Sequence, residues 1–376
     1  MIVMVLDHVR DFFHDGAQHF SPTDLAQTTP ILFLTRWITH FCAPTFMFLA
    51  GTGAYLQSRA GESHSGVAQF LWTRGLWLVV LEITWVRWFG WRMNFGEDQV
   101  FLWVIWALGV SMIALSGLIF IPWRVLLVPS LAVILLHNAI DGIEPARFGP
   151  VGWLWKILHV PDSFTVNHTA ILTTYPLIPW IFVMAAGYCF GRVMDLDSQE
   201  RRRFLLRLGG ALIVGFVILR WANRYGDANP WSSRRNPILT IASFLNCTKY
   251  PPSLLFLLMT IGPGIVALGL LERVRVSKAN PLVVFGRVPL FFYLLHLPLI
   301  HGLAVALAWC RYGRVGFMLH NPPSLWGPTV LFPNDYGYSL GAVYLIWLCI
   351  VATLYPVCRW FADLKQKNRA AILSYL

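Results

Sequence analysis

The chain has 376 residues, of which 57% are apolar and 12% are charged, and its formal net charge is +11. A soluble domain carries about 25% charged residues, so this composition excludes a soluble enzyme, a disordered chain and a fibrous protein. It predicts an all-α, polytopic integral membrane protein. The excess of positive charge is typical of basic loops that face anionic membrane lipid. No motif for nucleic-acid binding accompanies it, and the six cysteines form no CxxC pair that would indicate a metal site.

Ten apolar segments are candidates for membrane-spanning helices, because about 20 apolar residues cross a bilayer. In chain order they cover residues 1–14, 31–56, 67–90, 100–121, 123–139, 171–192, 204–223, 252–271, 283–309 and 338–360. We expect one transmembrane domain over residues 1–360 and a short cytoplasmic tail over residues 361–376. The first segment has only six residues before the polar cluster that starts at Asp7. We therefore expect the natural protein to begin upstream of Met1.

The distribution of Lys and Arg predicts the orientation in the membrane. Basic residues follow the sixth, eighth and tenth segments: Arg192, Arg201, Arg202, Arg203, Arg273, Arg275, Lys278, Arg359, Lys365, Lys367 and Arg369. Short loops rich in Lys and Arg face the cytoplasm, so both termini are expected to be cytoplasmic. The long loops 140–170, 224–251 and 310–337 then lie outside.

The first segment carries the densest group of ionisable residues. Asp7 and Asp11 share a helix face at i,i+4, and His8 shares a face with Asp11 at i,i+3. Ionisable residues inside a span are costly and are functional candidates by default. A histidine beside a carboxylate serves as a general base or a nucleophile with an orienting partner. We therefore expect His8 to act as a general base or nucleophile, oriented by Asp7 or Asp11.

The second segment places Arg36 and His40 on one face at i,i+4. Their depth matches that of the cluster in the first segment, which predicts a shared polar cavity. A guanidinium group in such a cavity can stabilise an oxyanion, so we expect Arg36 and His40 to polarise an acyl carbonyl. The remaining polar residues near this cavity are assigned to substrate binding: Lys249, Tyr250, Arg287 and His296.

The same residue types also suit a proton-coupled transporter of a small anionic or sugar substrate. Against that alternative, the two halves of the chain show no pair of matching broken helices. A third hypothesis is a scaffold or assembly subunit without activity of its own.

Four motifs resemble bacterial membrane proteins of the heparan-α-glucosaminide N-acetyltransferase catalytic-domain family. They are residues Asp7–His14, Thr35–Pro44, Lys249–Leu254 and Phe285–His296, and the resemblance runs from Met1 to roughly Phe361. It implies acetyl-CoA from the cytosol as acyl donor and a sugar or glycan amine or hydroxyl at the outer face as acceptor. Membrane lipid is a further expected partner, and a homodimer is left open.

The resemblance also implies roles for individual residues. The family's active-site histidine follows its first helix, where this chain offers His14 and His19. The resemblance therefore implies that His8 or His14 is the catalytic base or acyl carrier, oriented by Asp7 or Asp11, and His19 is assigned to substrate binding. His8 falls close to an active-site asparagine of the eukaryotic enzyme. His40 stands where the family has aspartate in its Asp-Leu-Val-Phe-Pro pattern, so the chain departs from the family at that position.

Overall fold

The computed structural model describes residues 1–91, 95, 99–319, 332–368, 373 and 375. The chain divides into two compact units, each built from discontinuous segments. The first unit comprises Met1–Cys42, Ile83–Gly96 and Arg275–Leu376, and the second comprises Ala43–Glu82 and Glu97–Val274. Part of the loop expected over residues 310–337 lies outside the described residues.

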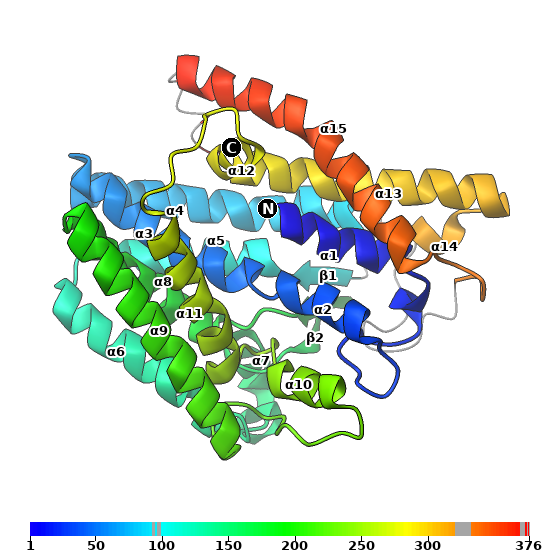
Figure 1. Ribbon diagram of the computed structural model, residues 1–376, viewed down its shortest axis with the longest axis horizontal. Coiled ribbons are helices and arrows are strands. Elements are labelled where there is room, and N and C mark those ends of the chain that lie inside the picture. The colour runs from blue at the N-terminus through cyan, green and yellow to red at the C-terminus, as the bar shows by residue number, and fades with distance from the viewer. Residues whose placement is uncertain (92–94, 96–98, 320–331, 369–372, 374, 376) are drawn as a thin grey trace. The chain divides into compact units, whose positions relative to one another are not determined.

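The first unit is a group of helices around a short inner helix. Its helices are α1 (Ile2–Phe13), α2 (Pro30–Thr39), α12 (Pro281–Arg287), α13 (Pro289–Tyr312), α14 (Gly316–Leu319) and α15 (Leu340–Lys367), with the 3-10 turn η1 (Asp15–Gln18) after α1. Helix α1 packs against α2, α13 and α15, and Figure 1 shows α15 crossing it. A helix that is apolar on several sides belongs in a core, and Val5, Val9 and Phe13 of α1 are fully buried.

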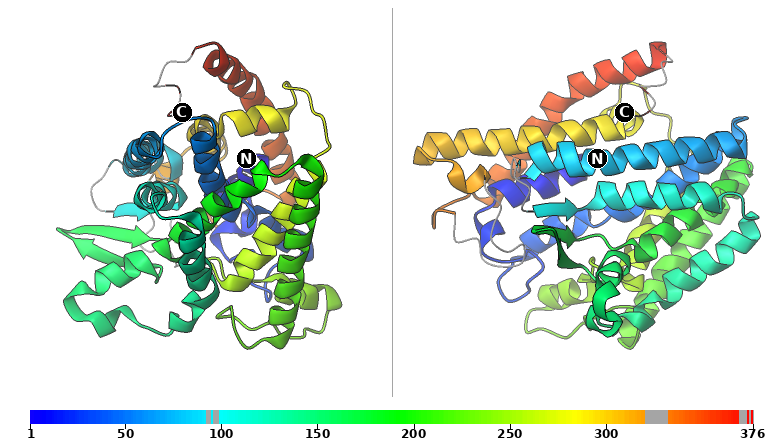
Figure 2. Two further views of the ribbon diagram at one scale, coloured as in Figure 1. Left: turned by 90° about the vertical axis from the view of Figure 1, so that its left-hand side faces the viewer. Right: turned by 180° about the vertical axis from the view of Figure 1, so that it is seen from behind.

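The second unit consists of helices α3 to α11, several of which pack in neighbouring pairs. They are α3 (Cys42–Arg59), α4 (His64–Leu81), α5 (Val104–Leu118), α6 (Trp123–Leu136), α7 (Gly152–Leu158), α8 (Leu177–Phe190), α9 (Ser198–Ala222), α10 (Pro237–Leu245) and α11 (Leu254–Leu271). Helix α11 lies along α9, α5 along α4, and α6 along α8 (Figure 2). Side-chain caps start several of them, because Ser63, Asp197 and Ser253 accept hydrogen bonds from the first-turn amides of α4, α9 and α11.

A ten-residue π-helix, η2 (Glu82–Trp91), continues the chain after α4. π-helical turns are rare and concentrate at functional sites. The residues of η2 from Ile83 onward belong to the first unit, and its last residue, Trp91, contacts the candidate site described below.

A small sheet in the second unit departs from the all-α prediction. It consists of β1 (Gln99–Leu102), β2 (Asp162–Val166) and β3 (Thr169–Thr173), in the order β1-β3-β2. Strand β3 pairs in parallel with β1 and antiparallel with β2. The sequence predicted an irregular loop over residues 140–170 and a helix from residue 171, whereas α8 begins only at Leu177. Open sheet edges are not tolerated against lipid, so the edges of this sheet do not face the hydrocarbon core.

Within the described residues, eight helices are long and apolar enough to cross a membrane. They are Pro30–Arg59, His64–Trp91, Trp123–Ile140, Leu177–Asp195, Ser198–Ala222, Leu254–Leu271, Pro289–Tyr312 and Leu340–Lys367. The two other expected spans are shorter helices, α5 with 15 residues and α1 with 12. The chain is therefore a polytopic, mostly helical membrane protein. The expected helix over residues 31–56 is interrupted between Thr39 and Cys42 and so forms the two helices α2 and α3.

Glycine allows α3 and α8 to approach each other closely. A Cβ atom on Gly51 would lie 1.9 Å from the Met184 carbonyl oxygen, and one on Gly187 would lie 2.0 Å from the Phe48 carbonyl oxygen. The Thr52 hydroxyl donates a hydrogen bond to the Gly187 carbonyl at 3.0 Å. Small residues at a helix crossing let the backbones touch, as the Gly51-Thr52-Gly53 motif indicates.

Replacing Gly51 with alanine is expected to destabilise the protein by about 3 kcal/mol, at the upper end of overpacking costs. The added methyl group meets backbone atoms, which no side-chain rotation can relieve. Thermal unfolding in detergent measures the effect. Gly53→Ala is the matched control, because a Cβ there meets nothing within 4 Å. Equal melting temperatures for the two variants would contradict the close crossing.

Candidate active site

The polar residues of α1 divide between two faces of the helix. Asp7, Arg10 and Asp11 occupy one face at i, i+3 and i+4, and His8 and Phe12 occupy another at i and i+4. The first face meets α2 and the second meets Trp91 and α13. The two faces thus build an ionic cluster and an imidazole pair within the first unit.

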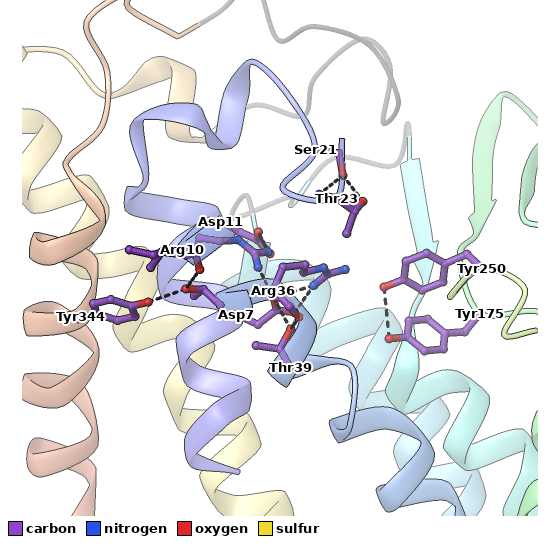
Figure 3. Close-up of polar contacts among 12 residues, drawn as sticks. Asp7, Arg10, Asp11, Ser21, Thr23, Arg36, Thr39, Tyr175, Tyr250 and Tyr344 are labelled. Carbon is purple, nitrogen blue, oxygen red and sulfur yellow. Dashed lines mark hydrogen bonds and ion pairs between the residues drawn. The ribbon is translucent and has the colours of Figure 1, made fainter. Parts of the chain in front are cut away.

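The ionic cluster is centred on the carboxylate of Asp7 (Figure 3). Arg36 Nη1 of α2 lies 2.6 Å from Asp7 Oδ1 and 2.5 Å from Oδ2. Arg10 Nη1 lies 2.9 Å from Asp7 Oδ1, and the Thr39 hydroxyl donates to the same oxygen at 2.9 Å.

Asp11 completes this cluster, with Oδ1 2.5 Å from Arg10 Nη2. Two guanidinium groups therefore face two carboxylates. Buried charges are tolerated when they are paired in this way, and Asp7 is only 8% exposed.

The imidazole pair joins α1 to α13. The ring centroids of His8 and His296 lie 5.2 Å apart, and the edge of the Trp91 ring packs 4.9 Å from the His8 ring. His296 Nδ1 lies 2.6 Å from the Tyr293 carbonyl oxygen. Because a carbonyl oxygen only accepts, Nδ1 carries the proton and Nε2 keeps its lone pair. The His296 side chain is fully buried, and within the described part of the chain its Nε2 has no hydrogen-bond partner.

His14 has a structural role at the end of α1. His14 Nδ1 accepts a hydrogen bond from the Gly16 amide at 3.0 Å and so caps the η1 turn. Its backbone pairs in parallel with Tyr338, which fixes the end of α1. His19 is exposed beyond that turn, whereas His40 is buried at the end of α2. Of the predicted candidates for the catalytic histidine, His8 is therefore the one that faces a second imidazole.

One of the residues assigned to substrate binding, Arg287, contacts the C-terminal part of α15. Arg287 Nη2 donates to the Ala362 carbonyl and to Gln366 Oε1 near the end of α15. Tyr344, near the start of α15, hydrogen-bonds Thr35 beside the ionic cluster at 2.6 Å. The 18 residues between Tyr344 and Ala362 span about 27 Å of helix, so Arg287 lies away from the cluster.

Lys249 and Tyr250 belong to the second unit. There Lys249 Nζ lies 5.1 Å from the centre of the Tyr250 ring. The hydroxyl of Tyr250 faces that of Tyr175 at 3.5 Å (Figure 3).

Sequence reasoning missed two aromatic residues of the site. Trp91 packs on His8 and stacks on Phe12, and His301 lies 5.1 Å from the Phe12 ring. No local pattern connects Trp91 to α1, because the contact depends on how η2 packs. His301 lies five residues after His296, so the two share a helix face only loosely and nothing in that spacing pointed to Phe12.

A second histidine–carboxylate cluster lies in the second unit. His159 Nε2 donates to Asp141 Oδ1 at 2.8 Å, and Asn138 donates to Asp141 Oδ2 at 2.8 Å. Burial alone raises the pKa of Asp141, but these hydrogen bonds outweigh it and lower the pKa below its usual value. His137 Nε2 donates to the Pro252 carbonyl at 2.9 Å. These contacts tie η3 (His137–Ile140) to the start of α11, which is a structural role.

The arrangement in the first unit has the parts of a general-base site. A neutral imidazole with an available lone pair accepts a proton from an attacking amine or hydroxyl. A guanidinium group stabilises negative charge on a carbonyl oxygen. Among the described residues, no group of histidine, cysteine, aspartate and glutamate side chains is arranged to hold a metal ion.

One known protein family matches this chain. The model of the family described as heparan-alpha-glucosaminide N-acetyltransferase, catalytic, matches residues 1–219. That region holds α1, α2 and η2 and so includes the ionic cluster and His8, while His296 lies beyond it. A search of curated proteins found no match. Because the matched region covers more than half of the 376 residues, the chain belongs to the heparan-alpha-glucosaminide N-acetyltransferase catalytic-domain family.

Proposed function

We propose that this protein is a membrane acetyltransferase that moves the acetyl group of acetyl-CoA to an amine or hydroxyl of a sugar. The family is named for such a transfer. The observation that carries the proposal is the buried His296 imidazole, whose Nε2 has no hydrogen-bond partner among the described residues and whose ring packs against the His8 ring. A buried polar atom without a partner calls for a functional explanation, and a proton-accepting role supplies one.

The proposed chemistry is a direct acyl transfer. The acceptor nitrogen or oxygen attacks the thioester carbonyl and passes its proton to His296 Nε2. The tetrahedral intermediate collapses as the carbon–sulfur bond breaks. The departing thiolate then takes up that proton and leaves as the CoA thiol, and His8 holds the imidazole and the acceptor in place. No atom of the enzyme is consumed, because the base is restored in each cycle.

Arg36 is proposed to stabilise the oxyanion of this intermediate, with Asp7 as its positioning residue. Asp7 and His8 are consecutive on α1, so the Arg36–Asp7 pair and the imidazole pair lie at the same level of this helix, on two different faces. A donor held in place before reaction costs no reorganisation when charge develops. In this scheme Asp7 orients Arg36 rather than His8, which revises the role expected from sequence.

The other predicted residues keep proposed binding roles. Lys249 and Tyr250 offer a cation and an aromatic ring that suit the hydroxyls and the apolar face of a sugar. His19 and His40 remain candidates for contact with the acceptor and the acyl group. Acetyl-CoA would approach from the side of the basic loops, which the positive-inside rule assigns to the cytoplasm of a bacterial inner membrane.

Transfer of radiolabel tests the proposal. Purified protein in nanodiscs is mixed with acetyl-CoA labelled in the acetyl group, with and without glucosamine, and label is measured on sugar and on protein. We expect acetylated sugar and no lasting label on protein. Label trapped on His8 would replace direct transfer with an acyl-enzyme. If acetyl-CoA neither binds nor reacts, the transferase proposal fails, and substrate-driven proton flux without acyl-CoA would support the transporter.

A further inference from the structure

Two arginine side chains of the second unit share one tryptophan ring. The guanidinium carbon of Arg124, in the first turn of α6, lies 5.3 Å from the centre of the Trp123 ring. That of Arg192, in the turn η5 (Gly191–Asp195) after α8, lies 5.1 Å from the same centre. Arg192 also lies 5.8 Å from the centre of the Tyr55 ring. The two cations are thus held around Trp123 from segments that are separate in sequence, α6 and the turn η5.

This positive charge is not neutralised within the described residues. Neither Arg124 nor Arg192 forms an ion pair there, and both side chains are exposed. The carboxylate of Asp195 forms an ion pair with Arg59, whose Nε lies 2.9 Å from Asp195 Oδ1, and accepts a hydrogen bond from the Tyr55 hydroxyl. Like charges held near one ring repel each other, so an anion between them would be stabilised.

An apolar track leads away from the two arginines along α6. Val125, Val128, Leu131 and Leu135 are 60%, 68%, 44% and 47% exposed. The opposite side of α6, with Leu126 and Ser130, is buried, and α6 packs against α8. From Val125 to Leu135 the track is about 15 Å long, which is about half of the 30 Å hydrocarbon core of a bilayer. The length of the track therefore matches that of one acyl chain in one leaflet of the bilayer.

We propose that Arg124 and Arg192 bind the phosphate of an anionic phospholipid whose acyl chain lies along the exposed side of α6. The cations supply the charge complementarity and the track distinguishes a lipid from a soluble phosphate. Trp and Tyr side chains mark the membrane interface, which places Trp123 and Tyr55 at headgroup depth. Basic sites between helices at this depth bind anionic headgroups. This site is independent of the proposed transferase chemistry, which is built on the first unit.

Native mass spectrometry tests the site. The protein is released from nanodiscs that contain phosphatidylcholine and phosphatidylglycerol in a ratio of about 7:3, and the retained lipid is identified. Wild type is expected to retain phosphatidylglycerol preferentially. In the double variant R124Q/R192Q this preference is expected to be about 25-fold weaker, since each arginine that contacts the lipid headgroup contributes about fivefold.

The control R203Q/R207Q removes the same charge from exposed arginines of α9. It should keep the preference, because it leaves the two cations at Trp123 in place. Equal losses in the two double variants would overturn the site in favour of general surface charge. An unchanged preference in R124Q/R192Q would overturn it directly.

Glycerol 3-phosphate and inorganic phosphate serve as soluble competitors in the same measurement. We expect neither to displace the retained lipid, because they lack the acyl chain. Displacement by either one would show that phosphate binds there without an acyl chain on the apolar track, and it would overturn the lipid assignment.

Discussion

Replacing Asp7 with asparagine is expected to lower the free energy of unfolding by about 3–5 kcal/mol, the cost of removing one partner from a buried ion pair. The substitution keeps the size of the side chain but leaves Arg36 and Arg10 without the carboxylate that they share. Arg10 is 3% exposed, so water cannot replace the lost partner. Chemical denaturation of purified protein in detergent measures the change.

A double-mutant cycle separates this ion pair from other effects of the substitution. We expect D7N and R36Q to couple by about 2 kcal/mol, because the second substitution removes the cation that the first leaves unpaired. The matched control is the ion pair of Arg59 with Asp195, whose side chains are 51% and 39% exposed. Coupling there should stay below about 1 kcal/mol. Additive effects at Asp7 and Arg36 would contradict the ionic cluster as described.

Arg220 is the second position at which a large loss is expected. Its guanidinium group is 1% exposed and donates to four backbone carbonyls, those of Asn229, Ser243, Phe244 and Asn246. R220Q leaves most of these buried acceptors unpaired, at about 1–3 kcal/mol for each unsatisfied group. We expect a loss of at least about 3 kcal/mol in the free energy of unfolding.

The control for Arg220 is R224Q, just beyond the end of α9. Arg224 is exposed, and surface substitutions usually change stability by less than about 0.5 kcal/mol. A thermal melt compares the two variants with wild type. If R220Q and R224Q have the same melting temperature, the four carbonyl contacts do not hold the segment between α9 and α11 in place.

The helices of this fold follow from local patterns in the sequence. Each of the ten apolar segments contains a helix, because length and hydropathy alone decide whether a segment can satisfy its backbone in a membrane. The small sheet was missed because its strands pair residues far apart, such as Gln99 with Ala170. Such pairing leaves no periodic signal in a four-residue strand. The break between α2 and α3 was missed because His40 and Phe41 are compatible with a continuous helix.

The candidate site could be predicted in part. Helix spacing predicted that Asp7 and Asp11 share one face of α1. In the structure this face carries the ionic cluster, in which Asp7 binds Arg36. The spacing could not show that Arg10 stands between the two carboxylates. It also could not show that His8 turns away from them toward His296. Those outcomes depend on the packing of α1 against α2 and α13, which joins residues separated by nearly the whole chain.

The central claim is that His8 and His296 form the chemical centre, and acetyl transfer by three histidine variants tests it most directly. We expect H296F and H8N to reduce kcat by about 100-fold or more, the usual contribution of a general base. H14N should retain most of the wild-type rate, because the asparagine oxygen can replace the imidazole as acceptor for the Gly16 amide. Melting temperatures near that of wild type confirm that each variant is folded. Full activity in H296F, or loss of activity in H14N alone, would contradict the account.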